Sequence, residues 1–572
     1  MALPSVTAQQ RYDEPMDTQE VLKVVPPPTH STWRDSRCIL LGALIIYAIA
    51  ATFFSVREAD YINADFVAYA TIAHRFLHHP AAALSGFWSP LFSWFMAPLI
   101  YFGASDLVAG RAILVLAGAL YIVSIYWLIA RIRTDKLPPN SSVLAGVIAC
   151  AVLQATLWAT YLLDPDLLAA AFLFCYFATV VNPSPSRNMR RPFFGGIAAG
   201  LAFLAKAYML PFVLGHLLIT LLLRRRVALR FVAPLVVGLT LIAAPWISIL
   251  TTRFHRLTFS TAGSINHAKV SPADYGHNPV WNTGLIPNYV IDRPLAPDWS
   301  PLQDRQHLYH QLKLIAKNAG DCSTELISWL LFTLAAVACW RIRVKRKKET
   351  IDEPTRSTIV WCLITILIYV AGYMMIQVQS RYVVPIVAPL LCLIGFMLII
   401  PFSPTQTHAP NPNRFALLSS IRIGLLLLLP FSVQDGFHLA HVAIVHPQSQ
   451  RLSHSRAIAS QLQQIGALNY PMACNHWHGG LFVAYASDHI STYLGAPVSG
   501  DPNLIEKQLQ DVGVRCYLRW LNPNRDPASM TLVDRFVPPR PWKKILVVRD
   551  PALRVRQIEV YGISTDPPGS LE

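Results

Sequence analysis

Acidic residues that could take a proton from a reacting group stand at two places in this sequence. In the stretch 60–69 (DYINADFVAY), Asp65 and Tyr69 are four residues apart and would share one face of a helix. At the second place, Asp164 and Asp166 flank a proline at the head of an apolar run. A carboxylate can act as general base toward a hydroxyl nucleophile. A solvated acidic loop and acids capping a helix N-terminus are the simpler explanations.

Two cations stand in equally apolar surroundings. Lys206 interrupts the block 193–223, and Arg381 precedes Tyr382 at the start of another apolar run. A lone lysine in such a block either extends to the membrane surface or meets an anion, and an arginine there either anchors the helix or binds phosphate. The sequence leaves both readings open at both positions. Trp88, in the segment GFWSP, is typical of an aromatic at the membrane interface.

The elements that must position these residues are membrane helices. The chain has 572 residues, of which 53% are hydrophobic and only 14% charged, whereas soluble proteins carry about 25% charged residues. A helix of about 20 apolar residues crosses the hydrocarbon layer. The apolar runs predict an all-α polytopic membrane domain of about 11 to 13 transmembrane helices over residues 38–434. These runs are 38–56, 88–103, 107–130, 142–162, 166–182, 193–223, 231–250, 323–340, 357–377, 382–400 and 415–433.

The net charge of +16 indicates membrane orientation rather than a nucleic-acid partner, because the basic residues cluster beside the apolar runs. Arg34 and Arg37 are predicted to keep the N-terminus inside the cell, which places the loop 57–87 outside. The clusters at 224–226 and 341–348 are also predicted to lie inside, which places the loop 251–321 outside. Asp166 also lies outside the cell only if the segment 88–130 crosses the membrane an odd number of times and the block 193–223 crosses it twice. One crossing per run would put Asp166 inside, and we favour the first arrangement.

The two ends of the chain differ from its middle. Residues 1–37 are polar and predict a disordered cytoplasmic tail. Residues 435–572 alternate between helical and strand patterns, which predicts a small extracytoplasmic α/β domain. The helices are expected at 455–465, 480–486 and 504–512, and the strands at 471–474, 515–518, 544–548 and 557–563. Whether Cys474 and Cys516 pair there is not decided by the sequence, and His476 with His478 gives too few ligands for a zinc site.

Taken in order, these fragments resemble the GT-C superfamily of membrane glycosyltransferases. The nearest branch is that of bacterial relatives of dolichyl-phosphate-mannose protein mannosyltransferases and lipid A aminoarabinose transferases. The resemblance covers roughly residues 38–400. It rests on the segments containing Asp65 and Tyr69, GFWSP at 86–90, PDLL at 165–168, LAKAY at 204–208 and QSRY at 379–382.

The resemblance implies a sugar transferase that uses a polyprenyl-phosphate-linked donor at the external face, with inversion at the anomeric carbon. The family's catalytic acid maps to Asp65, with Asp60 as its substitute, and Asp166 is the second catalytic residue we expect. Lys206 and Arg381 would hold the lipid phosphate. Substrate contacts are expected from Asp60, Tyr69, Trp88, Tyr208 and Tyr382. The aminoarabinose branch has a Lys-Pro-Pro segment where this chain has Trp88-Ser-Pro, without the lysine.

The resemblance further implies an integral protein of the bacterial inner membrane, with membrane lipids, the lipid-linked donor and a glycan, lipid or protein acceptor as partners. No cofactor is required by the pattern, and it stays open whether Asp65 and Asp166 hold a divalent metal ion. A transporter or flippase of an envelope precursor is the main alternative, because charged residues inside membrane helices also mark transport pathways. No inverted repeat in the sequence supports it. A scaffold for envelope assembly is a third possibility, but it leaves the two acidic sites unexplained.

Overall fold

The computed structural model describes residues 30–132, 141–182, 189–223, 225–272, 299–347, 351, 353–399, 451–497, 501–521, 535–549 and 557–563. Most of the expected tail 1–37, part of the loop 251–321 and the expected apolar span 415–433 lie outside these residues.

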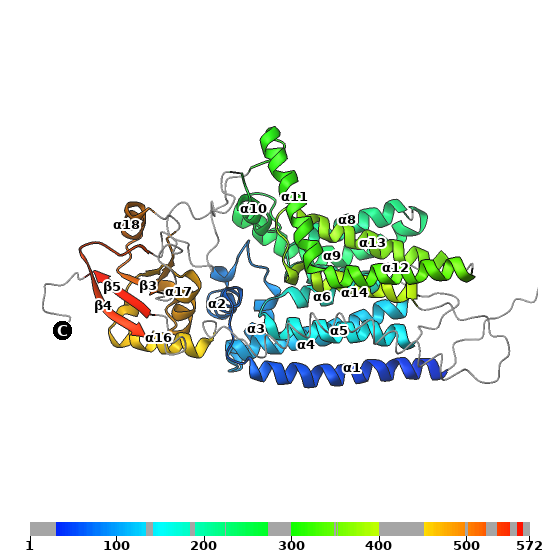
Figure 1. Ribbon diagram of the computed structural model, residues 1–572, viewed down its shortest axis with the longest axis horizontal. Coiled ribbons are helices and arrows are strands. Elements are labelled where there is room, and N and C mark those ends of the chain that lie inside the picture. Colours follow the sequence, from blue (N-terminus) through cyan, green and yellow to red (C-terminus); the bar gives the residue numbers. More distant parts are fainter. Residues whose placement is uncertain are drawn as a thin grey trace, which may run out of the picture.

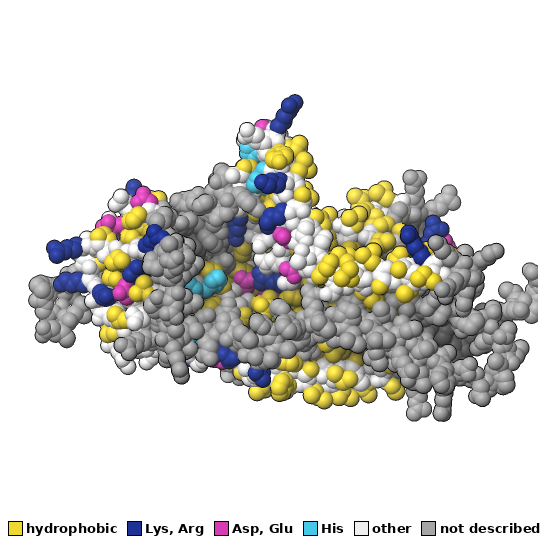
Figure 2. Space-filling model, in the orientation of Figure 1, with side chains coloured by type: hydrophobic (Ala, Val, Ile, Leu, Met, Phe, Trp, Pro, Cys, Tyr) yellow, Lys and Arg dark blue, Asp and Glu magenta, His cyan; other side chains and the backbone are white. Residues whose placement is uncertain are grey.

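Most of the long helices of the membrane part lie side by side with their axes nearly parallel, whereas the helix Arg305–Glu325 stands at a steep angle to them (Figure 1). Outward-facing side chains on these helices are largely hydrophobic (Figure 2). In chain order the helices are α1 (His30–Arg57), α2 (Ala64–His78), α3 (Leu91–Tyr101), α4 (Asp106–Arg131), α5 (Ser141–Tyr161), α6 (Asp166–Val180), α7 (Arg190–Ala205), α8 (Met209–Leu223), α9 (Arg225–Phe254), α10 (Ala262–Ala268), α11 (Arg305–Glu325), α12 (Ile327–Lys347), α13 (Glu353–Met374) and α14 (Ser380–Ile399).

The predicted fold class is confirmed, whereas the predicted number of spans is not reached by length and composition alone. Among the described residues, 6 helices are long and apolar enough to cross a membrane, or up to 7 if α11 and α12, which meet at 74°, count as one broken span. Shorter apolar helices are Leu91–Tyr101, Asp166–Val180 and Met209–Leu222. The prediction of about 11 to 13 includes these shorter runs and the run 415–433, which lies outside the described residues.

The segment 88–130 crosses the bundle once. α3 has 11 residues and is therefore about 16 Å long, too short for the hydrocarbon layer of about 30 Å. α4 alone runs the length of the bundle, from Asp106 to Arg131. The distribution of basic residues required an odd number of crossings for the segment 88–130, and this segment has one helix that runs the length of the bundle.

The block 193–223 is broken into two helices at Lys206. Lys206 has extended backbone angles (φ −151°, ψ 117°) and ends α7, and α8 begins three residues later. Pro211 lies in the first turn of α8, where its missing N–H costs no helical hydrogen bond. The break returns the chain, so that α6 and α8 begin at the same end of the bundle. We call this the Asp166 end, and the opposite one, where α4 stops, the Arg131 end.

Glycines let α7 and α9 approach closely. A Cβ atom on Gly196 would overlap the backbone carbonyl oxygen of Leu235, and one on Gly238 would overlap that of Phe193. Small residues at helix crossings are typical of membrane bundles, where close backbone packing replaces the hydrophobic effect. This pair lets the backbones of α7 and α9 pack directly against each other.

The C-terminal residues form a separate α/β unit, as predicted. Its mixed sheet has the strand order β2-β1-β3-β5-β4, with β1 parallel to β2 and β3, and β5 antiparallel to β3 and β4. The expected helices and strands are all present, and only β2 was missed. The elements are α16 (Leu452–Gln464), β1 (Met472–Cys474), α17 (Trp477–Ala486), β2 (Tyr493–Gly495), α18 (Pro502–Asp511), β3 (Cys516–Leu521), β4 (Trp542–Arg549) and β5 (Gln557–Ile563).

Two sulfur atoms whose pairing the sequence left undecided are separate thiols. Cys474 and Cys516 are both buried and free. The Cys474 thiol lies 3.2 Å from the hydroxyl of Tyr493 on β2. Burial raises the pKa of both thiols to about 12, so neither is a reactive thiolate at neutral pH.

The C-terminal unit lies against the first loop at the Asp166 end, with α17 beside α2 (Figure 1). Tyr61 and Arg451 form an antiparallel bridge, and the Leu452 amide donates to the Asp60 carbonyl at 2.8 Å. The Tyr485 hydroxyl of α17 donates to the Asp106 carboxylate at 2.6 Å. The C-terminal unit therefore holds residues 60 and 61, just before α2 and Asp65, and it also contacts the start of α4.

Candidate active site

One cavity at the Asp166 end collects almost all of the residues singled out in the sequence. Its volume is about 650 Å³. Figure 2 shows acidic, basic and histidine side chains gathered in a hollow where the bundle meets the C-terminal unit. The predicted site residues that line this cavity are Asp65, Tyr69, Trp88, Asp166, Lys206, Tyr208, Arg381 and Tyr382.

Asp65 lies in the first turn of α2, where a negative charge is favoured by the helix dipole. Its Oδ2 accepts a hydrogen bond from Nη1 of Arg381 at 2.7 Å. The side chain of Asp65 is 23% exposed and faces the cavity, so a bound molecule could reach its carboxylate.

Asp164 and Asp166 meet the same arginine from α6. Asp164 Oδ1 accepts from the Asp166 amide at 3.1 Å, which caps the helix, while its Oδ2 accepts from Arg381 Nη1 at 3.0 Å. Asp166 Oδ2 lies 3.8 Å from Arg381 Nε. Capping therefore explains one oxygen of Asp164 and leaves its second oxygen to the site. Burial, and after it the neighbouring Asp166 carboxylate, raises the pKa of Asp164 above its ordinary value.

Lys206 meets an anion and does not extend to the membrane surface. Its ammonium donates to Oδ1 of Asp166. The same nitrogen lies 3.7 Å from the centre of the Tyr382 ring, a cation–π distance. Because the helix is broken at this residue, Lys206 is placed at the end of α7 rather than along its side.

Arg381 is the centre of the cluster. Besides the three carboxylates, its Nε donates to Gln379 Oε1 at 2.8 Å and its Nη2 to the Tyr382 hydroxyl at 3.2 Å. The planar guanidinium suits several acceptors at fixed angles, which a lysine could not serve together. The cluster around Arg381 therefore holds three acids and, with Lys206, two cations, so it carries a net charge of −1 when all three acids are ionised.

Aromatic side chains form the walls. Tyr69 packs edge-on against Trp88 with ring centres 5.1 Å apart, and the Ser93 hydroxyl donates to the Tyr69 carbonyl at 2.8 Å. On the opposite side, the rings of Tyr208 and Tyr373 are 4.1 Å apart. The Tyr208 hydroxyl donates to the Tyr369 carbonyl at 2.6 Å, which joins the break between α7 and α8 to α13. Such walls could pack against a sugar ring or an isoprenoid chain.

Asp60 does not line the cavity, although it was expected to contact substrate. Its carboxylate accepts hydrogen bonds from the amide of Ser453, at 3.0 and 3.1 Å, and from the hydroxyl of the same residue. Asp60 thus lies outside the cavity, where the first loop contacts the C-terminal unit. Sequence could not show this, because Asp60 and Ser453 are 393 residues apart.

Part of the cavity wall was missed by sequence reasoning. α10 and the residue after it contribute Asn266, His267 and Lys269. The His267 ring stacks on Trp299 at 4.4 Å between ring centres, and Lys269 lies over the Phe87 ring at 5.6 Å. A seven-residue helix in a long polar loop leaves no periodic signal, so only the fold brings it to the site.

A divalent ion has no prepared place among these groups. Within the described ranges no group of three or more His, Cys, Asp or Glu could hold a metal ion. Asp65 and Asp166, the pair considered for this role, already contact Arg381 and Lys206. We therefore derive no chemical step through a metal.

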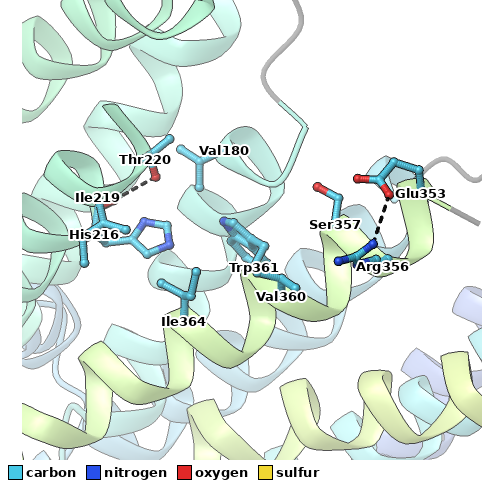
Figure 3. Close-up of a pocket in the computed structure, with 10 residues that line it drawn as sticks. All are labelled: Val180, His216, Ile219, Thr220, Glu353, Arg356, Ser357, Val360, Trp361 and Ile364. Atoms are coloured by element: carbon cyan, nitrogen blue, oxygen red, sulfur yellow. Dashed lines mark hydrogen bonds and ion pairs between the residues drawn. The ribbon is translucent and has the colours of Figure 1, made fainter. Parts of the chain in front are cut away.

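A pocket of about 370 Å³ near the Arg131 end does not compete as an active site. His216 is held there by the Tyr176 hydroxyl at 2.8 Å and the Thr365 hydroxyl at 3.1 Å, as a buried structural histidine would be. Glu353 and Arg356 pair with each other at 4.0 Å. Figure 3 shows this pair at one side of the pocket and His216 at the other, with Trp361 between them.

Comparison with known proteins establishes the fold. The structure of ArnT from Cupriavidus metallidurans bound to undecaprenyl phosphate matches with a TM-score of 0.53 at 15% identity, over 93% of this chain and 98% of that chain. The apo state of the same protein gives 0.51 at 15% identity, over 91% and 98%. No protein-family model and no curated protein matches the sequence. At this identity the likeness shows a shared fold along nearly the whole of both chains, and it is the fold that the sequence resemblance predicted.

Proposed function

We propose that this protein transfers a sugar from a polyprenyl-phosphate-linked donor to an acceptor hydroxyl in the cavity at the Asp166 end. The observation that carries the proposal is the convergence of Asp65, Asp166, Lys206 and Arg381, from four separate helices or helix junctions, on one cavity. The shared fold adds support, because the ArnT structure contains undecaprenyl phosphate.

Asp65 is the general base in this proposal. A hydroxyl is a poor nucleophile until a base takes its proton as the new bond forms. Asp65 faces the cavity and is oriented by Arg381 at 2.7 Å. Attack by the hydroxyl oxygen on the anomeric carbon breaks the bond to the phosphate oxygen, which leaves with the electron pair. A single displacement of this kind inverts the configuration.

Lys206 and Arg381 stabilise the departing lipid phosphate. Such a leaving group is already a stable anion, so fixed positive charge near its oxygens favours departure more than a proton donor would. Both cations are paired with carboxylates in the resting site, so the donor phosphate must take the place of a carboxylate. Asp164 is the acid we expect to give way, because burial raises its pKa and favours its neutral form.

The acceptor is defined only by its hydroxyl, which can belong to a glycan, a lipid or a protein. The side wall made by Asn266, His267 and Lys269 borders the same cavity and offers polar contacts to it. We place this reaction at the external face of the bacterial inner membrane, following the distribution of basic residues.

The decisive experiment compares Asp65→Asn with wild type in membranes supplied with a labelled polyprenyl-phosphate sugar and an acceptor extract. Asparagine keeps the size of the side chain but removes its basicity, so transfer should fall by about 10² to 10⁴-fold. Asp60→Asn is the matched control in the same loop and should be much milder, because Asp60 bonds Ser453 outside the cavity.

Two results would contradict the proposal. Full transfer by Asp65→Asn together with loss in Asp166→Asn would move the role of base to Asp166. If the wild type consumes no polyprenyl-phosphate sugar, the chemistry itself is wrong. The transporter alternative then becomes the better explanation of charged residues in a membrane cavity.

A further inference from the structure

A groove at the Arg131 end, lying between α1, α4, α6 and α7, carries an unusual charge. Its volume is about 760 Å³. Arg37 from α1, Arg131 from the last residue of α4 and Arg191 from the first turn of α7 all line it. None of the described residues that line it is acidic. We call it the arginine groove.

The arginine groove continues into apolar surface. Phe172, Phe194 and Leu201 line it, and Leu201 lies about 15 Å further along α7 than Arg191. Phe194 is 61% exposed and Trp127 is 50% exposed, so the groove opens sideways from the bundle. One end of it is thus cationic and the rest is apolar and faces the lipid.

The helix ends hold the side chain of Arg191 and the backbone of Arg131. Arg191 Nη2 donates to the carbonyl oxygens of Ala178 and Thr179 at 2.8 and 3.0 Å. Asn182 donates to the Arg131 carbonyl at 2.7 Å, which fixes the end of α4. Among the residues that the structure describes, the guanidinium groups of Arg37 and Arg131 make no hydrogen bond or ion pair.

Simpler explanations account for the arginines one at a time but not for the groove. A cation at a helix C-terminus is favoured by the helix dipole, which would explain Arg131. Basic residues at the cytoplasmic side orient a membrane protein, which would explain all three. Neither requires that they line one cavity whose deeper wall is apolar and open to lipid.

We propose that the arginine groove binds an anionic phospholipid. Its phosphate contacts Arg37, Arg131 and Arg191, and one acyl chain lies along Phe194 and Leu201. Guanidinium groups match the oxygens of a phosphate, and anionic lipids are enriched in the cytoplasmic leaflet, which the basic-loop pattern places at this end. The site is at the opposite end of α6 from Asp166 and is independent of the proposed sugar transfer.

Native mass spectrometry of the full-length protein in detergent tests this proposal, with phosphatidylglycerol as the probe and phosphatidylcholine of the same chain length as the neutral comparison. The wild-type protein should retain phosphatidylglycerol more tightly than phosphatidylcholine. The double variant Arg37→Gln/Arg131→Gln should bind it about 10- to 100-fold more weakly, because two charge-assisted hydrogen-bonding groups are lost. Arg356→Gln is the matched control, since it removes a charge at the same end outside the arginine groove.

A single variant keeps the test valid if the double variant does not fold. Arg37 is exposed near the start of α1, so Arg37→Gln should fold normally and should still weaken phosphatidylglycerol binding severalfold. Equal binding of phosphatidylglycerol by wild type and Arg37→Gln would overturn the proposal. Equal binding of phosphatidylcholine and phosphatidylglycerol by wild type would overturn it as well.

Discussion

Arg381 contacts more charged groups than any other described residue of the site, and its shape matters as much as its charge. One nitrogen, Nη1, serves both Asp65 and Asp164, while the other two reach Gln379 and Tyr382. A lysine carries the same charge but offers it from a single atom. The geometry of the proposed base thus depends on a residue from α14, 316 positions away along the chain.

Replacing Arg381 by lysine should therefore preserve folding but impair transfer. We expect Arg381→Lys to lower the rate of sugar transfer by about 10²-fold or more, the usual effect of losing a fixed donor to developing negative charge. The measurement is the initial rate with a labelled lipid donor. Arg356→Lys, in an exposed pair at the other end, is the control and should match wild type. Unchanged transfer by Arg381→Lys would show that positive charge alone suffices there.

Lys206 gives a prediction about stability. Its ammonium is the direct partner of the Asp166 carboxylate, and both side chains are largely buried. Breaking such a pair leaves an uncompensated buried charge and costs roughly 3–5 kcal/mol. We expect Lys206→Met to lower the thermal unfolding temperature in detergent clearly, and the double variant Lys206→Met/Asp166→Leu to recover much of the loss. If Lys206→Met is as stable as wild type, the pair contributes little.

Residue types and order were enough to predict most of the site, but not how its members pair. Asp65, Lys206 and Arg381 were identified because charges are costly in apolar runs and therefore need a reason. Asp164 was explained as a helix cap, which accounts for only one of its two oxygens. Asp60 was placed in the site because it is close in sequence to Asp65, whereas its partner Ser453 belongs to the C-terminal unit.

At the scale of elements, the break between α7 and α8 decides where Lys206 lies. The interruption of 193–223 by Lys206 and Pro211 allowed one tilted helix or two short ones, and the distribution of basic residues favoured two crossings. What the sequence did not identify is the partner of α7 in close packing. Gly196 and Gly200 form a G-x-x-x-G segment, which is typical of a close helix crossing, but the pattern alone does not show that the partner is α9, where Gly238 meets Phe193.

A pair of glycine substitutions tests this packing. A methyl group on Gly196 would overlap the Leu235 carbonyl oxygen, so Gly196→Ala must force α7 and α9 apart. We expect a loss of about 1–3 kcal/mol, seen as a lower unfolding temperature and reduced transfer. Gly215→Ala in α8 is the matched control, since its nearest neighbour would be 3.9 Å away. That substitution should be neutral or slightly stabilising. Similar behaviour of the two variants would argue against close packing.

At the scale of the whole molecule, the two ends differ in the charged residues that they carry. The cavity and the C-terminal unit are at the Asp166 end, where carboxylates and cations are mixed. At the Arg131 end the arginine groove has no acidic lining among the described residues. Sequence predicted this division from the basic loops, and it predicted the helices and strands of the C-terminal unit from their periodicity. The docking of that unit on the first loop depends on contacts between distant residues, for which one sequence gives no signal.

This division leads to a prediction about orientation in the membrane. Basic residues are retained on the cytoplasmic side, so the Arg131 end should face the cytoplasm and the C-terminal unit should not. A reporter that is active only in the cytoplasm should be silent when fused after Ile563, at the end of β5. The same reporter fused after Lys347, at the end of α12 beside the basic run 341–348, should be active.

Because the two fusions report opposite ends of one bundle, expression differences alone cannot produce this pattern if both proteins are detected equally. If the reporter is active after Ile563 and silent after Lys347, the protein has the opposite orientation in the membrane. The cavity would then open to the cytoplasm, and the arginine groove would face the external leaflet, where anionic phospholipid would no longer be its expected occupant.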